Sequence, residues 1–464
     1  MRMIKNTGLA IIFLIVAISS KAAEIKFISE AYAGDDFSFY IIPNFLTENQ
    51  VVVGNGTVDE SGAFSCELDI SEEITVFTEF DVFKGWFILK PNESVEIILP
   101  PKTPKTSTNP YFKLRQVHFG IKNPEPDNTN TLVDNFTRIY NNKMNKNFQE
   151  IFQRRSLETA EAVIAELKES YPETDNPYFE NFKKYKYATL KYTAQIQEPE
   201  PVMDEYYINN PILYSHPDYA ELFDKLFGKY LQYATQQVNG QKISVMLNSG
   251  AYEQLSDWLT IDMGFDKALA EAIILKGIKP IFYSKRFNTV GLFSILQKIT
   301  DTSEVEEHKT TASYVFNQLA RTMYGTIAPE LDLIDINGGI ATWEDYKGKY
   351  VYLCFTRTDN EKFVPHKNLM REFQKKYSDD LAIVVVVEDD KIDENKDILG
   401  CDDFEWTILR GQTRREIYES FNVRIMPTYF LVDPNGRMAG SQAPWPDENF
   451  EMQFDNILKA TKME

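Results

Sequence analysis

The sequence predicts a multidomain protein: an N-terminal antiparallel β domain, a central all-α domain and a C-terminal α/β domain. Three patterns support this: alternating apolar residues over 24–100, apolar spacings of three and four over 111–323, and apolar strands around a helical stripe over 326–464. A chain of 464 residues can hold roughly two to four domains of ~100–200 residues each.

Residues 1–23 are typical of a signal peptide. Arg2 and Lys5 precede the apolar run 8–18, and the segment 20–22 offers small residues for cleavage. The run is too short to span a bilayer comfortably, because a spanning helix needs about 20 apolar residues. We expect an exported protein of the periplasm or cell envelope, soluble after cleavage and not an integral membrane protein. An uncleaved N-terminal anchor is the alternative.

Residues 24–100 are expected to form the β domain. Asn55-Gly56 and Ser61-Gly62 are turn signals between strands. The proline-rich segment 100–110 is predicted to be a stiff linker. Apolar residues alternate with polar or small ones at Phe37, Phe39 and Ile41 and again at Val95, Ile97 and Leu99.

Residues 111–323 are expected to form the helical domain, with about seven to nine helices. Ser303 and Glu306 have the spacing of a capping box. The apolar stripes that predict helices are Leu157, Ala160, Ile164 and Leu167; Leu222, Leu226 and Tyr230; Leu269, Ile273 and Gly277; and Leu292, Leu296 and Ile299.

The last part of the chain, residues 326–464, has the order of an α/β domain. Apolar strands are expected at 348–355, 381–387 and 428–432, and Leu369 and Phe373 indicate a helix between the first two. The segment 433–436, Asp-Pro-Asn-Gly, is a strong turn signal. Strands separated by helices predict a buried sheet.

These residues resemble the thioredoxin-fold domain of the TlpA/ResA type, found in bacterial cell envelopes. The resemblance covers about 140 of the 464 residues and implies that the Met426–Pro427 peptide bond is cis, facing a redox site. The β order before residue 100 and the segment 271–277 also resemble long Bacteroidetes-type proteins with such a domain. The matching motifs are Ala328-Pro329-Glu330-Leu331-Asp332-Leu333, Asn337-Gly338-Gly339, Gly348-Lys349-Tyr350-Val351, and Met426-Pro427-Thr428 with Asp433 and Gly436.

The sequence departs from this family at the redox motif. A Cys-x-x-Cys should follow a few residues after Phe355, but the segment 356–366 contains no cysteine. Thiol–disulfide exchange needs one thiolate that attacks and a second that resolves. Asn360 and Phe363 can do neither. A peroxiredoxin cysteine would occupy the same loop, so the sequence predicts no catalytic residue here.

The three cysteines do not form a disulfide framework, because their number is odd and their spacing is not repeated. Cys354 ends a central strand and is expected to be a buried core thiol. Cys66 lies in a strand-like stretch. Cys401 follows Gly400 in a predicted loop and is the one cysteine expected to react.

No metal site or cofactor is predicted. The four histidines are far apart in sequence, whereas a zinc site needs clustered ligands. No Gly-rich phosphate loop follows a predicted strand. His366 is expected on the surface of the first helix of the α/β domain. The other histidines are His118, His216 and His308.

The candidate binding site is the loop that replaces the redox motif, together with the proline surface beside it. In a thioredoxin fold this surface binds an extended peptide, so we expect the charged loop to recognise a polypeptide or a small ligand. A solvated loop at an abandoned site is the alternative. The residues are Arg357, Thr358, Asp359, Asn360, Glu361, Lys362, Phe363, Met426, Pro427 and Thr428.

The sequence therefore favours a non-catalytic binding or scaffolding protein of the cell envelope, with a polypeptide or envelope protein as its partner. A TlpA-like thiol-disulfide oxidoreductase and a subunit of a larger envelope assembly are the alternatives. The net charge of −20 argues against nucleic acid and anionic membranes, since both repel an acidic protein. The sequence gives no oligomeric state.

Overall fold

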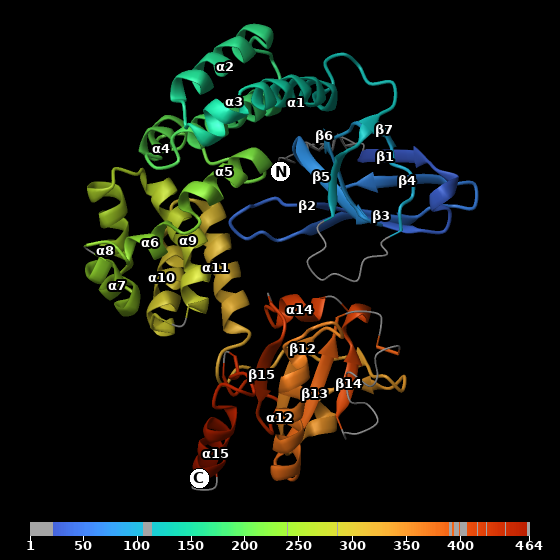
Figure 1. Cartoon of the computed structure of the whole chain (residues 1–464), viewed down its shortest axis with the longest axis vertical. Helices are drawn as coiled ribbons and strands as arrows, with labels where there is room; N and C mark the ends of the chain where they lie inside the picture. Colours follow the sequence, from blue (N-terminus) through green and yellow to red (C-terminus); the bar gives the residue numbers. More distant parts are fainter. Residues whose placement is uncertain are drawn as a thin grey trace, which may run out of the picture. The chain divides into compact units, whose positions relative to one another are not determined.

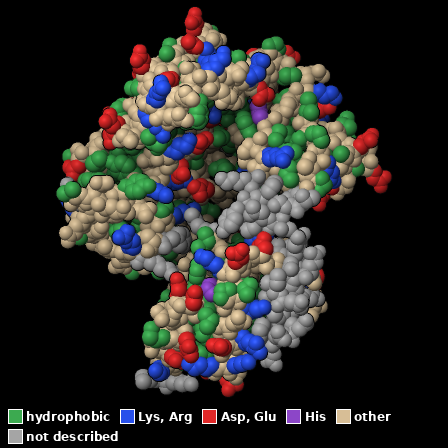
Figure 2. All heavy atoms as spheres, in the orientation of Figure 1, with side chains coloured by type: hydrophobic (Ala, Val, Ile, Leu, Met, Phe, Trp, Pro, Cys, Tyr) green, Lys and Arg blue, Asp and Glu red, His purple; other side chains and the backbone are tan. Residues whose placement is uncertain are grey.

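The computed structural model describes residues 22–104, 114–238, 240–284, 286–388, 392–393, 399, 406–414, 416–423, 425–440 and 442–461, without the side chains of Tyr283 and Thr413. Most of the predicted signal peptide and Cys401 lie outside these residues. The chain divides into two compact units, residues 1–228 and 229–464, and each is described by itself (Figure 1). Asp and Glu side chains are scattered among Lys and Arg over the face seen in Figure 2.

The N-terminal region is sheet-rich, as predicted. Its two sheets have the strand orders β4-β1-β7-β9 and β3-β2-β5-β6-β8. Most pairs are antiparallel, but β1 pairs in parallel with β7, and β6 with β8. The strands are β1 Ala23–Ile28, β2 Asp36–Ile41, β3 Val51–Thr57, β4 Ala63–Leu68, β5 Ile74–Phe80, β6 Phe83–Leu89, β7 Ser94–Ile98, β8 Arg115–His118 and β9 Gly120–Ile121.

Aromatic side chains fill the core of this region. Phe37 and Phe39 are both buried, as their alternation predicts. The rings of Phe27 and Phe64 stack with centroids 4.7 Å apart. Strands β8 and β9 follow the predicted linker and flank the buried Phe119. A Cβ at Gly85 would lie 1.9 Å from the Phe119 ring, so this aromatic core needs a glycine at that position.

Residues 129–320 are helical, as predicted, and contain more helices than expected. The predicted stripe that joined Leu226 to Tyr230 is interrupted, because α5 ends at Phe227 and α6 begins at Tyr230. Short helices of this kind raise the number. The helices are α1 Thr129–Lys146, α2 Leu157–Ser170, α3 Pro177–Ala194, α4 Glu200–Tyr206, α5 Pro217–Phe227, α6 Tyr230–Ala234, α7 Gly240–Ser249, α8 Tyr252–Asp257, α9 Lys267–Tyr283, α10 Thr289–Thr302 and α11 Glu306–Ala320.

The capping box predicted at Ser303 is wrong. Helix α11 has Val305 at its N-cap, with no side-chain cap. The Ser303 hydroxyl instead donates to Glu271 Oε2 at 2.6 Å. The Tyr252 hydroxyl donates to Glu271 Oε1 at 2.6 Å, and His308 Nδ1 lies 2.9 Å from Oε2. A carboxylate that is 1% exposed needs such partners. The Ser303 oxygen also accepts a hydrogen bond from the Val305 amide at 3.1 Å.

The C-terminal domain has the predicted thioredoxin-like α/β fold. Its sheet order is β14-β13-β12-β15, with β12, β13 and β14 parallel and β15 antiparallel to β12. A hairpin, β10 Leu333–Ile334 and β11 Ile340–Ala341, precedes the sheet. The other elements are β12 Tyr350–Thr356, α12 Phe363–Lys376, β13 Leu381–Val387, β14 Thr407–Arg410, α14 Glu416–Ser420, β15 Thr428–Val432 and α15 Phe450–Thr461.

Both faces of this sheet are covered. Every residue of β12 is buried, and the side chains of its two faces belong to separate hydrophobic clusters. The Met426–Pro427 peptide bond is cis, as predicted. Asp433 forms the expected turn, because its Oδ1 accepts hydrogen bonds from the Asn435 and Arg437 amides. In the part of the chain that the structure describes, no helix has the length and apolar character that crossing a membrane requires.

The Glu271 cluster is expected to make stability depend on pH. Burial acts to raise the pKa of Glu271, but hydrogen bonds from His308, Ser303 and Tyr252 outweigh it and hold the pKa below its ordinary value of 4.5. Such a carboxyl stabilises the fold above its unfolded-state pKa, and that contribution is lost as the pH falls through the folded-state value. The free energy of unfolding should therefore fall below about pH 4.5.

Glu271→Gln should lower the free energy of unfolding at neutral pH by roughly 3 kcal/mol, because it breaks a buried charged cluster. It should also flatten the pH dependence below about pH 4.5. Urea unfolding at neutral and acidic pH, followed by circular dichroism, measures both effects. Glu306→Gln removes an exposed carboxylate and serves as the control, with a change within about 0.5 kcal/mol. An unchanged pH dependence in Glu271→Gln would contradict this assignment.

Candidate functional site

The two segments of the predicted site lie next to each other. Strand β12 ends at Thr356, and the loop 357–362 leads directly into α12. In the β12–β15 ladder, Phe355 pairs with Thr428. Pro427 therefore stands beside the strand end from which the loop departs, as the resemblance implied.

Hydrogen bonds of its own residues shape this loop. Arg357 Nη1 donates to Glu388 Oε2 at 2.7 Å and its Nε to Asp359 Oδ1 at 3.2 Å. The Asn360 side chain accepts a hydrogen bond from the Lys362 amide at 3.1 Å. The Asn360 carbonyl accepts one from the Phe363 amide at 3.0 Å. Asn360 therefore closes the turn into α12.

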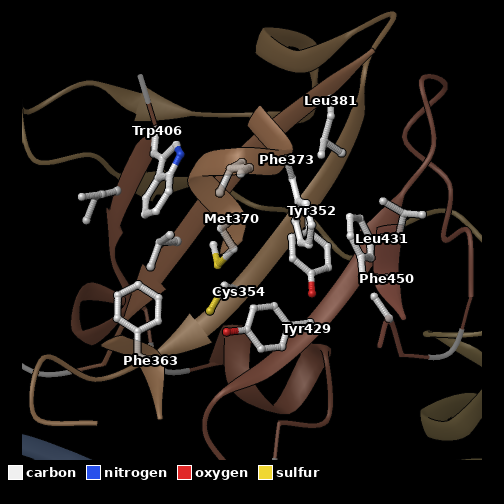
Figure 3. Close-up of a cluster of buried hydrophobic side chains, with 14 of the residues drawn as sticks. Tyr352, Cys354, Phe363, Met370, Phe373, Leu381, Trp406, Tyr429, Leu431 and Phe450 are labelled. Atoms are coloured by element: carbon white, nitrogen blue, oxygen red, sulfur yellow. The ribbon is translucent and has the colours of Figure 1, made fainter. Parts of the chain in front are cut away.

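Phe363 is a core residue. Its side chain is fully buried and belongs to the same cluster as Cys354, Met370 and Tyr429 (Figure 3). The start of α12 is therefore anchored in the core by an aromatic ring.

The remaining residues of the loop differ in exposure. Thr358 is buried, whereas Asp359, Glu361 and Lys362 are exposed. The Lys362 ammonium lies 4.9 Å from the centroid of the Trp445 ring. The loop therefore presents charges of both signs to solvent.

His366 is buried, so its expected place on a helix surface is wrong. Its Nδ1 lies 2.9 Å from the Tyr429 hydroxyl oxygen and its Nε2 lies 3.2 Å from Asp447 Oδ1. Burial lowers the pKa of His366, while Asp447 acts in the opposite direction. The spacing of Phe363, His366 and Met370 could have revealed this, because three and four residues apart is the period of a buried helix face.

Cys354 is a core thiol, as predicted. Its side chain is fully buried, and its sulfur lies near the Tyr429 hydroxyl in Figure 3. Burial raises the pKa of Cys354 far above its ordinary value. Cys66 in β4 is also buried, and burial raises its pKa too. Because the thiolate is the reactive form, neither group is suited to thiol exchange.

The surface beside the cis proline includes a residue that the sequence analysis missed. Pro427 and Thr428 are buried and Met426 is half-buried, but Ile425 is 67% exposed. The Thr428 hydroxyl donates to the Ile425 carbonyl at 2.5 Å. Ile425 directly precedes the Met-Pro-Thr motif. An apolar residue next to this motif could have indicated that Ile425 belongs to the candidate surface.

Metal binding has no visible support in the described ranges. They contain no group of three or more His, Cys, Asp or Glu side chains that could hold a metal ion. What the arrangement offers is a cis-proline surface, an exposed isoleucine and a charged loop. These groups can contact a ligand.

The buried thiols make a prediction about chemical labelling. In a Cys401→Ser variant, native protein should react with the thiol reagent DTNB only over hours, because Cys66 and Cys354 are buried with raised pKa values. After denaturation both should react at once, as followed by absorbance. Wild-type protein measured in parallel isolates the contribution of Cys401. Rapid labelling of the native variant would show that one of these thiols is accessible.

Comparison with known proteins agrees with this fold. Residues 324–441 match the model of the AhpC/TSA family. The thioredoxin-like protein YneN of Bacillus subtilis is 28% identical over 113 residues, which cover 24% of this chain and 66% of that relative, slightly less than two thirds of its length. The C-terminal domain is therefore thioredoxin-like by sequence as well as by structure.

Several solved structures of similar proteins come from Bacteroides species. The thioredoxin domain of a thiol-disulfide oxidoreductase from Bacteroides vulgatus is 22% identical, with a TM-score of 0.26 over 28% of this chain and 96% of that chain. A thioredoxin-like protein from Bacteroides caccae is 14% identical, with a TM-score of 0.34 over 53% of this chain and 87% of that chain.

Proposed function

Given a C-terminal domain of thioredoxin-like fold, we propose that this protein is an exported, non-catalytic binding protein of the cell envelope. The supporting observation is the pair of residues in place of the redox motif. Phe363 is fully buried in the core, and Asn360 closes the turn before α12. The Asn360 side chain accepts a hydrogen bond from the Lys362 amide, so a thiol at either position would remove a structural contact. This supports a role without redox chemistry.

The proposed binding surface is the exposed chain before β15. Along β15 itself, the Ala439 amide donates to the Leu431 carbonyl and the Ala443 amide to the Tyr429 carbonyl. This edge of the sheet is therefore already covered at those two residues. The segment around Ile425 and Met426 lies beyond that cover, beside the charged loop. An extended polypeptide with an apolar side chain fits this surface best.

A thiol-disulfide oxidoreductase remains the second candidate, since that is the activity named for the similar Bacteroides vulgatus protein. It would have to use Cys401, which lies outside the described residues. A third candidate, a subunit of a larger envelope assembly, would use the helical region as an interface. Native mass spectrometry of the protein purified from its own envelope fraction tests that third proposal.

An insulin-reduction assay with dithiothreitol separates the first two candidates. The wild-type protein should not accelerate insulin precipitation over the buffer rate. The double variant Asn360→Cys/Phe363→Cys introduces a Cys-x-x-Cys motif at the start of α12, where the helix N-terminus lowers thiol pKa values. This variant should accelerate insulin precipitation by roughly tenfold or more. Wild-type turnover that disappears in Cys401→Ser would overturn the non-catalytic proposal and favour a one-cysteine enzyme.

Peptide binding is tested by crosslinking at the proposed surface. A photoreactive phenylalanine replaces Ile425, and the probe is reduced, carboxymethylated insulin B chain. The matched control carries the same group at Ile340, which is 68% exposed against 67% for Ile425. We expect a crosslinked product at Ile425 and little at Ile340, read by mass spectrometry. Equal yields at the two positions would mean that the peptide collides without docking.

A further inference from the structure

The C-terminal domain contains a cavity that the proposed function does not use. Its volume is about 600 Å³, within the ~300–1,000 Å³ range of small-molecule sites. It lies between the end of α12, the start of β13 and the start of β14. The parallel strands begin at this edge of the sheet, whereas the loop 357–362 follows the end of β12. The cavity is therefore at the opposite edge from the cis proline.

Positive charge dominates the lining. Lys347, Lys349, Arg371 and Lys375 line the cavity, with Asp345 as the acidic residue among them. The Asp345 carboxylate is engaged elsewhere, because its Oδ2 accepts hydrogen bonds from the Thr342 amide at 2.7 Å and hydroxyl at 3.2 Å. The chain has a net charge of −20, whereas the lining of this cavity is positively charged, with four cations and one carboxylate. Lys and Arg side chains are visible at the lower end of this domain in Figure 2.

Lys347 and Lys349 in this lining have structural contacts that leave capacity for a ligand. The Lys349 ammonium donates to the Ser378 carbonyl at 2.8 Å, and the Lys347 ammonium lies 3.2 Å from Glu344 Oε2. A lysine ammonium has three N–H donors. Each of these two lysines can therefore donate a further hydrogen bond to an anionic ligand. Lys375 lies in the last turn of α12 and is exposed.

Aromatic and apolar groups form the rest of the wall. Trp406 and Tyr346 line the cavity, together with Leu381 and Ile383 at the start of β13. Trp406 is 9% exposed and belongs to the hydrophobic core cluster, so its ring is held in place where it lines the cavity. A flat apolar body can pack against such a wall while its charges meet the cationic rim.

We propose that this cavity binds a small organic anion, one that carries two or more negative charges on a flat apolar body. The cationic rim selects the charge, since Arg and Lys are the usual partners of carboxylate and phosphate groups. The aromatic wall selects the apolar body. This site is independent of the peptide surface, because it lies at the other edge of the sheet.

The experiment uses full-length protein labelled with 5-fluorotryptophan and observed by fluorine NMR. The probes are benzene-1,3,5-tricarboxylate, phenyl phosphate and inorganic phosphate, each at millimolar concentration. The Trp406 signal is assigned with Trp406→Phe. We expect both aromatic anions to shift this signal, with saturation, and inorganic phosphate to bind at least severalfold more weakly. A tighter fit for one aromatic probe identifies the ligand's anionic group as carboxylate or phosphate.

Matched variants test the role of the rim. Lys375→Gln should weaken binding of both aromatic probes about fivefold. This fold-change corresponds to the loss of one charge contact near a surface, roughly 1 kcal/mol. Lys459→Gln, which removes an exposed lysine from the last turn of α15, should leave binding unchanged. An unmoved Trp406 signal overturns the proposal. So does equal weakening in both variants, because it would show non-specific attraction to the charge of the protein.

Discussion

The C-terminal domain depends on the burial of strand β12. All seven of its residues are buried, because helices and loops cover both faces of the sheet. Its pairing with β15 brings Tyr429 opposite Cys354, and the neighbouring Thr428 places the cis proline at the end of the strand. The loop 357–362, α12 and the proline surface all take their positions from this one strand.

The same strand positions the loop 357–362 that follows it. A thioredoxin-like domain needs a stable join between β12 and α12, whatever chemistry it performs. In this protein Asn360 and Phe363 supply that join with a hydrogen-bonded turn and a buried ring. His366 adds polar contacts to Tyr429 and Asp447. The region is held together by core packing and polar contacts.

Several features of the sequence were sufficient to predict the fold. The order of apolar strands and helical stripes predicted the three regions. The family resemblance at Met426-Pro427-Thr428 implied the cis peptide bond that the structure contains. Local patterns succeed here because strand and helix periodicity follow directly from which face is buried. The two strands β8 and β9 were not foreseen, since each is short and gains its stability from sheets formed earlier in the chain.

The sequence by itself determined that the motif of a thiol-exchange enzyme is missing, since no spatial arrangement can supply a cysteine at Asn360 or Phe363. Only the tertiary structure decided where the polar residues lie. His366 became buried because its side chain shares a helix face with Phe363 and Met370, and Ser303 turned to Glu271 because a buried carboxylate requires donors. Residues distant in sequence likewise come together around the cationic cavity. Such choices depend on partners contributed by other elements, and no local pattern records them.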